Sequence, residues 1–253
     1  MSQAIRIFTH AVSMVFRDLG ATLRATSVGV ILIALASALL IAIAPGLASG
    51  VTTFDDPEAL AQIPNFGLVV PAFFLMAIGY LVMIAAWHRF VLLPNDRRDE
   101  GFTPNAGIVL GYLGRSILLG LAVGLLAIPL FVVIGIVGAG AGEVVASIVA
   151  IPLIALMGWL LLRWSLILPA CTIGRKMTFK ESWEASKPLA GTIFVIMIIL
   201  AVVDFALNFA MAAVITDNVI SAIISIIVSV LYALVSASIL TTLYGIAVEG
   251  REV

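Results

Sequence analysis

Residues 192–215 read TIFVIMIILAVVDFALNFAMAAVI, an apolar run with Asp204 and Asn208 near its middle. A run of about 20 apolar residues is long enough to cross the hydrocarbon core of a bilayer, and a helix satisfies its own backbone there. Five more runs of this kind occur, at residues 27–44, 66–86, 116–137, 144–162 and 219–246. The sequence therefore predicts an all-α, polytopic transmembrane bundle of about six spans.

The composition excludes a soluble fold. The 253-residue chain is 63% hydrophobic and 11% charged, with a mean hydropathy of +1.24, whereas soluble domains are about 45–50% apolar and about 25% charged. We expect one integral membrane domain over residues 1–253, with no separate soluble domain. Its expected parts are an N-terminal interfacial amphipathic helix (1–24), the six-span bundle (25–246) and a cytoplasmic tail (247–253).

The distribution of positive charge predicts the orientation. With six spans, all thirteen Lys and Arg residues fall on one side of the membrane: Arg6, Arg17, Arg24, Arg89, Arg97, Arg98, Arg115, Arg163, Arg175, Lys176, Lys180, Lys187 and Arg251. The other side carries Asp55, Asp56, Glu58, Glu143 and Asp217. Positive charge is retained in the cytoplasm, so we expect a multi-pass membrane protein with both termini cytoplasmic.

The first apolar run has a competing interpretation as a cleaved signal peptide, because Ala42-Ile43-Ala44 resembles a cleavage site. Pro45 follows directly and disfavours cleavage. We therefore expect this run to be a span.

Two short segments are expected on the cytoplasmic surface. Residues 5–16 place apolar side chains, among them Ile5, Phe8 and Phe16, on one helical face, as in a helix at the lipid interface. The alternative is a helix packed under the bundle. A second helix is predicted after Thr178, because Thr178 and Glu181 form a capping-box pattern. Thr103-Pro104 predicts another helix start.

Two cytoplasmic ends resemble each other. WHRFVLLP at 87–94 and LRWSLILP at 162–169 each carry Trp and Arg before an apolar stretch that ends in proline, and each proline precedes a threonine by nine residues. This suggests repeated helix pairs by duplication, and a chance or shared-interface origin stays open.

The same segments carry a family resemblance. The amphipathic N-terminal helix, the six spans, WHRFVLLP, LRWSLILPACTIGRKMTFKESWEASK and LTTLYGIAVEGR resemble uncharacterised bacterial six-span proteins related to the YciC-like group and to the membrane domain of glycerophosphodiester phosphodiesterases. The resemblance implies a helical bundle without an assigned activity. The soluble phosphodiesterase domain is absent from the sequence, so that activity is not carried over.

The first candidate site is polar and lies inside the membrane. Ionisable groups within spans face the bundle interior or a water path, and counting from the turn at Asp217 places Asp204 level with Ser229 and Asn208 level with Ser225. This pattern is typical of a proton or cation site. The alternative, which we favour, is an interhelical hydrogen-bond clamp with Asp204 protonated.

The second candidate site is basic. Arg89, Arg115 and Arg163 are expected at the inner hydrocarbon–headgroup boundary, where guanidinium groups bind phosphate. The alternative, again favoured, is that they extend to the interface beside an aromatic belt. A further pair, Gly120 and Gly124, predicts a close helix contact.

No P-loop, HExxH, paired CxxC or GxSxG motif occurs, so we predict no catalytic residues, no metal site and no cofactor. The expected function is that of a non-enzymatic scaffold, accessory subunit or lipid-binding protein. The alternative is a small transporter or lipid-handling protein that uses Asp204 and Asn208.

The expected partners are membrane lipids, and another membrane protein is a further candidate partner. The net charge of −1 argues against nucleic acid, and the oligomeric state stays open.

Overall fold

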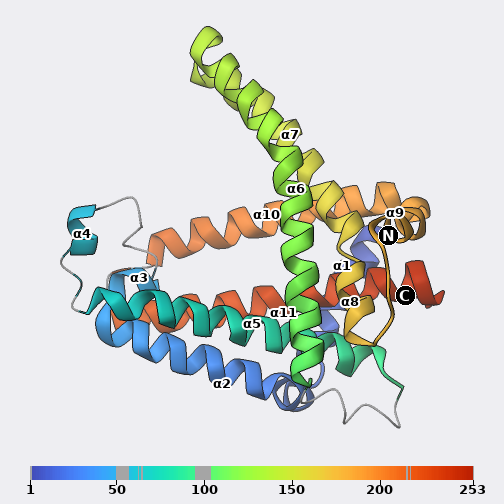
Figure 1. Cartoon of the computed structure of the whole chain (residues 1–253), viewed down its shortest axis with the longest axis horizontal. Coiled ribbons are helices and arrows are strands. Elements are labelled where there is room, and N and C mark those ends of the chain that lie inside the picture. Colours follow the sequence, from blue (N-terminus) through green and yellow to red (C-terminus); the bar gives the residue numbers. More distant parts are fainter. Residues whose placement is uncertain are drawn as a thin grey trace. The chain divides into compact units, whose positions relative to one another are not determined.

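The computed structural model describes residues 2–49, 57–61, 63, 65–94, 104–214, 216 and 218–252 (Figure 1). These residues are almost entirely helical, and none of them lies in a strand. Six helices among them are long and apolar enough to cross a membrane. The predicted all-α, six-span fold is therefore confirmed, and the chain is a multi-pass membrane protein. The predicted helix start at Thr103 and the turn residue Asp217 lie outside the described residues.

The spans occupy long helices, with shorter helices between them. The long helices are α2 (Leu19–Ile43), α5 (Val69–Leu92), α6 (Ala106–Ala141), α7 (Glu143–Trp164), α10 (Ala190–Val214) and α11 (Val219–Glu249). The short ones are α1 (Gln3–Phe16), α3 (Pro45–Ser49), α4 (Pro57–Ala61), η1 (Phe66–Leu68), α8 (Ile167–Thr172), α9 (Phe179–Ser186) and η3 (Lys187–Leu189).

The long helices extend beyond several of the apolar runs, which changes the expected boundaries. The Asp18 side chain accepts a hydrogen bond from Ala21 N at 2.9 Å, and this cap starts α2 at Leu19. The N-terminal helix therefore ends at Phe16 rather than at residue 24. At the other end, α11 continues to Glu249, past the expected limit of residue 246.

The buried face of α1 differs from the predicted apolar face. Ala4, Ile7, Ala11 and Val15 are at most 2% exposed, whereas Ile5 is 42% and Phe16 is 47% exposed. The helix thus buries one stripe in protein and leaves other apolar side chains on the outside. Packing against the rest of the protein describes the buried stripe, and contact of the exposed apolar side chains with lipid stays a prediction.

Contacts divide the chain into two compact units. Unit 1 contains Met1–His10, Ala106–Ala201 and Ile239–Val253, and unit 2 contains Ala11–Asn105 and Val202–Ser238. Each unit combines segments that are far apart in the sequence.

In unit 2, α2 and α5 approach each other closely at two glycines. A Cβ atom on Gly29 would lie 2.5 Å from Met83 Cβ and 2.6 Å from Gly79 O. A Cβ atom on Gly79 would lie 2.8 Å from Ile33 Cγ1. Only glycine fits at these positions, as in many contacts between membrane helices.

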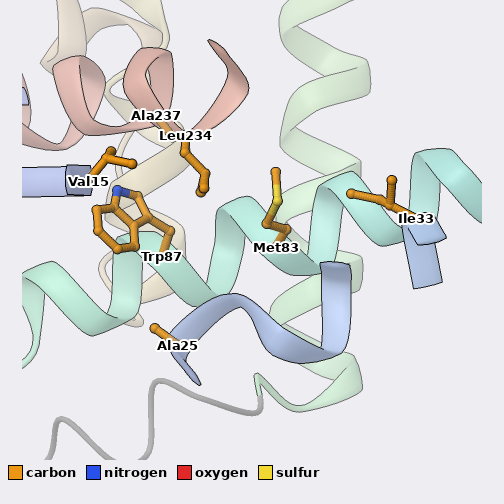
Figure 2. Close-up of a cluster of buried hydrophobic side chains, with 7 residues drawn as sticks. All are labelled: Val15, Ala25, Ile33, Met83, Trp87, Leu234 and Ala237. Atoms are coloured by element: carbon orange, nitrogen blue, oxygen red, sulfur yellow. The ribbon is translucent and has the colours of Figure 1, made fainter. Parts of the chain in front are cut away.

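The core of unit 2 lies beside this contact. Figure 2 shows Trp87 of α5 near Val15 and Leu234 at one end of the cluster, with Met83 further along α5 and Ile33 at the other end. The Trp87 indole Nε1 donates to Ser238 Oγ at 2.9 Å, so the one polar group of this large side chain is satisfied within the core.

In unit 1, α6 and α7 form a helical hairpin. Gly142, with φ +88°, makes the turn between them, a backbone conformation that favours glycine. Tyr112 and Leu119 are the buried residues of α6, and Arg163 is the buried residue of α7. Most of the apolar surface of this hairpin is therefore exposed in the described part of the chain.

Candidate functional site

The turn between α10 and α11 sets the register of the intramembrane site. Ser221 N donates to Asn218 Oδ1 at 2.8 Å, which caps α11. Thr216 N donates to Ser221 Oγ at 3.0 Å. These bonds fix the start of α11, which begins five residues after Val214, the last residue of α10.

All four predicted intramembrane residues line one recess between α10 and α11. Asp204, Asn208, Ser225 and Ser229 surround a volume of about 220 Å³ together with Tyr232. Leu207, Met211 and Val228 complete the lining. We call this the Asp204 recess.

The hydrogen bonds of the Asp204 recess leave its carboxylate without a partner. Asn208 Nδ2 donates to Asp204 O at 2.9 Å, within its own helix. Among the described residues, the Asp204 carboxyl group makes no hydrogen bond or ion pair. The interhelical clamp favoured from the sequence is therefore not formed by this carboxyl group.

The solvent exposure of the residues in the Asp204 recess also differs from the prediction. Asp204, Asn208 and Ser229 are exposed, and Ser225 is half-buried. We expected Asp204 to face the bundle interior, but in the structure it lies at an open recess. Because nearly every side chain around α10 is apolar, the sequence contains no amphipathic signal that would have fixed the direction in which Asp204 faces.

The three arginines of the basic site lie in different surroundings. Arg89 belongs to unit 2, where it is 8% exposed at the end of α5 beside the fully buried His88. Arg115 and Arg163 belong to unit 1.

Arg163 is enclosed by protein. Its Nε donates to Ser186 Oγ at 3.1 Å and its Nη2 donates to Trp183 O at 2.8 Å. Its guanidinium carbon lies 3.3 Å from the centroid of the Trp183 ring and 4.9 Å from that of Trp159, and Ser182 Oγ donates to Arg163 O at 2.6 Å. This group fastens α9 to α7 through hydrogen bonds and cation–π contacts. It is not open to a lipid headgroup, in contrast to the predicted headgroup role.

Arg115 lines a recess of its own, of about 480 Å³. Arg115 is half-buried, its Nη1 donates to Gly111 O at 3.3 Å, and it interacts with the Cys171 thiol. The other lining residues are mostly apolar or glycine: Leu110, Gly111, Gly114, Leu118, Ile167, Met177, Thr178 and Phe179. We call this the Arg115 recess.

The rim of the Arg115 recess is held by the predicted capping box, which the structure confirms. Thr178 N donates to Glu181 Oε2 at 2.7 Å, and Glu181 N donates to Thr178 Oγ1 at 3.2 Å. The sequence interpretation missed the contribution of Gly111 and Gly114. Their spacing before Arg115 puts all three on one helical face, which was the available signal.

Comparisons of the chain with protein-family models, curated proteins and solved structures gave no match. The family resemblance stays a prediction, and function has to be argued from the two recesses.

Proposed function

We propose that the protein binds anionic lipid at the cytoplasmic face of a bacterial inner membrane, with both termini cytoplasmic, and acts there as a non-enzymatic scaffold or accessory subunit. The observation that carries the proposal is the Arg115 recess, in which one guanidinium group lies in a hollow whose other lining residues, apart from Thr178, are apolar or glycine. This combination matches an amphiphile that has an anionic head and an acyl chain.

Charge and chemistry support this ligand class. Guanidinium binds phosphate through paired N–H donors. Lys176 and Lys180 are exposed and flank the rim residues along the chain, so they add positive potential near the entrance. Leu110, Leu118 and Ile167 provide apolar surface for the adjoining acyl chain.

Native mass spectrometry of the full chain tests the proposal. The protein is extracted in mild detergent and titrated with phosphatidylglycerol or with phosphatidylcholine of the same acyl chains. We expect one anionic lipid to be retained preferentially, and we expect Arg115→Gln to weaken its binding by about tenfold, the equivalent of one charge-assisted hydrogen bond.

Two variants serve as controls. Lys180→Gln removes a charge from the exposed surface of α9 and should have a smaller effect, whereas Arg115→Lys keeps the charge and should lie between wild type and Arg115→Gln. Equal binding of the two lipids, or equal binding by wild type and Arg115→Gln, would contradict the proposal.

The same extraction separates the scaffold from a stand-alone protein. A stoichiometric membrane-protein partner that co-purifies with native lipid would support the scaffold or accessory role. A chain isolated with lipid alone would restrict the proposal to lipid binding.

One observation favours a second candidate function, a small transporter. The Asp204 recess brings together an intramembrane carboxylate and several hydroxyl and amide groups, a combination that is found along transport pathways. In proteoliposomes, Asp204→Asn should abolish uptake of the substrate while the protein stays folded. Unchanged uptake by a well-folded Asp204→Asn variant would remove this candidate.

A further inference from the structure

The Asp204 carboxylate lies far from both ends of its span. It is ten residues from Val214, the last residue of α10, and fourteen from Ala190, the first, which corresponds to about 15 and 21 Å along the helix axis. A carboxylate at this depth is costly unless something neutralises it. No described basic side chain of the protein does so.

The polar groups around the carboxylate are rich in oxygen, and Leu207, Met211 and Val228 form the apolar part of the lining. Asn208 donates one of its two amide N–H groups to the backbone of α10, and its amide oxygen, which accepts no hydrogen bond among the described residues, is available to the recess. Ser229 and Tyr232 add hydroxyl oxygens. Carboxylate, amide and hydroxyl oxygens are the ligands that hard cations prefer.

The charge of the recess selects the class of cation. One carboxylate neutralises one positive charge, so a divalent ion would leave a net positive charge inside the membrane. Calcium sites also need six to eight oxygen ligands, usually from several carboxylates. Among the described residues, no three His, Cys, Asp or Glu side chains come together, so the nitrogen and sulfur ligands typical of zinc or copper are not supplied either.

We propose that the Asp204 recess binds a single monovalent alkali cation, Na⁺ or K⁺, with Asp204 supplying the charge and Asn208 supplying a neutral oxygen. The volume of about 220 Å³ also leaves room for water molecules that complete the coordination shell. The proposal goes beyond lipid binding, and it holds whether or not the ion crosses the membrane.

Thermal unfolding of the purified full chain tests this proposal. Tm is measured while N-methyl-D-glucamine chloride is replaced by NaCl or KCl at constant ionic strength and constant pH. A ligand that binds the folded state raises Tm in proportion to the logarithm of 1 + [L]/Kd, by about 3–5 °C at ten times its dissociation constant for a chain of this size. We expect this rise in the wild-type protein.

Four variants test whether the effect comes from the recess. Asp204→Asn keeps the shape of the side chain and should abolish the rise, and Asn208→Leu should need a higher salt concentration for the same rise. Glu143→Gln removes a carboxylate from the exposed start of α7 and should behave like wild type. Arg115→Gln should also keep the rise, which separates this site from the lipid site.

Several results would overturn the proposal. An equal rise in Asp204→Asn would place the ion elsewhere, and equal Tm values in all three salts would mean that no alkali cation binds. A Tm that depends on pH through Asp204, but not on Na⁺ or K⁺, would assign the recess to a proton instead. If Asp204→Asn does not give a monodisperse protein, a rise in Asn208→Leu equal to that of wild type at every salt concentration would refute the site.

Discussion

Replacing Gly29 with alanine adds one methyl group where α2 and α5 are in closest contact. The new Cβ would lie 2.5 Å from Met83 Cβ and 2.6 Å from Gly79 O, whereas carbon atoms at optimal separation are about 3.5–4.0 Å apart. The obstacle is backbone and Cβ rather than the end of a flexible side chain, so the helices have to separate by about 1 Å.

The expected cost follows from two opposing terms. Overpacking of a tight contact costs about 1–3 kcal/mol, and alanine recovers about 1 kcal/mol of helix propensity relative to glycine. Taking the middle of the overpacking range, we expect Gly29→Ala to lower the free energy of unfolding by about 1 kcal/mol.

Gly120→Ala is the matched control, because a Cβ atom there meets nothing within 4 Å. That variant should be neutral or stabilised by up to about 1 kcal/mol, so the two Tm values in one detergent should differ by about 2–8 °C. Equal Tm values would refute the reasoning for the α2–α5 contact. A large loss in Gly120→Ala would instead mean that Gly120 packs against a partner, as the sequence pattern with Gly124 predicts.

Three further predictions concern single side chains. Arg163→Lys removes the planar group stacked on Trp183 and should destabilise the docking of α9 by about 1–2 kcal/mol; unchanged amide exchange in α9 would contradict this. Thr178→Ala removes the cap of α9 and should lower the free energy of unfolding by about 1 kcal/mol. Amide exchange should become faster in the first turn of α9 and stay unchanged in α2. Trp87→Phe removes the hydrogen bond to Ser238 and should lower the free energy of unfolding by about 1–2 kcal/mol. A Tm equal to that of the wild-type protein would contradict this prediction.

The sequence was sufficient for features that depend on local chemistry. Apolar runs predicted the six spans because only a helix satisfies its backbone in hydrocarbon, and the spacing of Thr178 and Glu181 predicted the capping box. The grouping of Asp204 with Ser229 could also be expected, because a short turn fixes the register of two antiparallel helices.

Features that depend on tertiary contact could not be predicted in this way. The cage around Arg163 requires Trp183, which is twenty residues away on another helix. The contact between Gly29 and Gly79 joins helices fifty residues apart and has no short motif. The GxxxG pattern at Gly120 and Gly124 is a stronger local signal, yet neither glycine has a neighbour within 4 Å of its Cβ position among the described residues.

The length of α6 relates this protein to the thickness of its membrane. Residues 116–141 of α6 contain no ionisable side chain, and this 26-residue stretch extends about 39 Å as a helix, against a hydrocarbon core of about 30 Å. If Arg115 lies among the headgroups, as we propose, the helix fits an average bilayer at a tilt of about 40° or by thickening the lipid around it. Lipids with longer acyl chains would reduce this mismatch, so α6 gives the protein a preference for the thicker regions of a membrane.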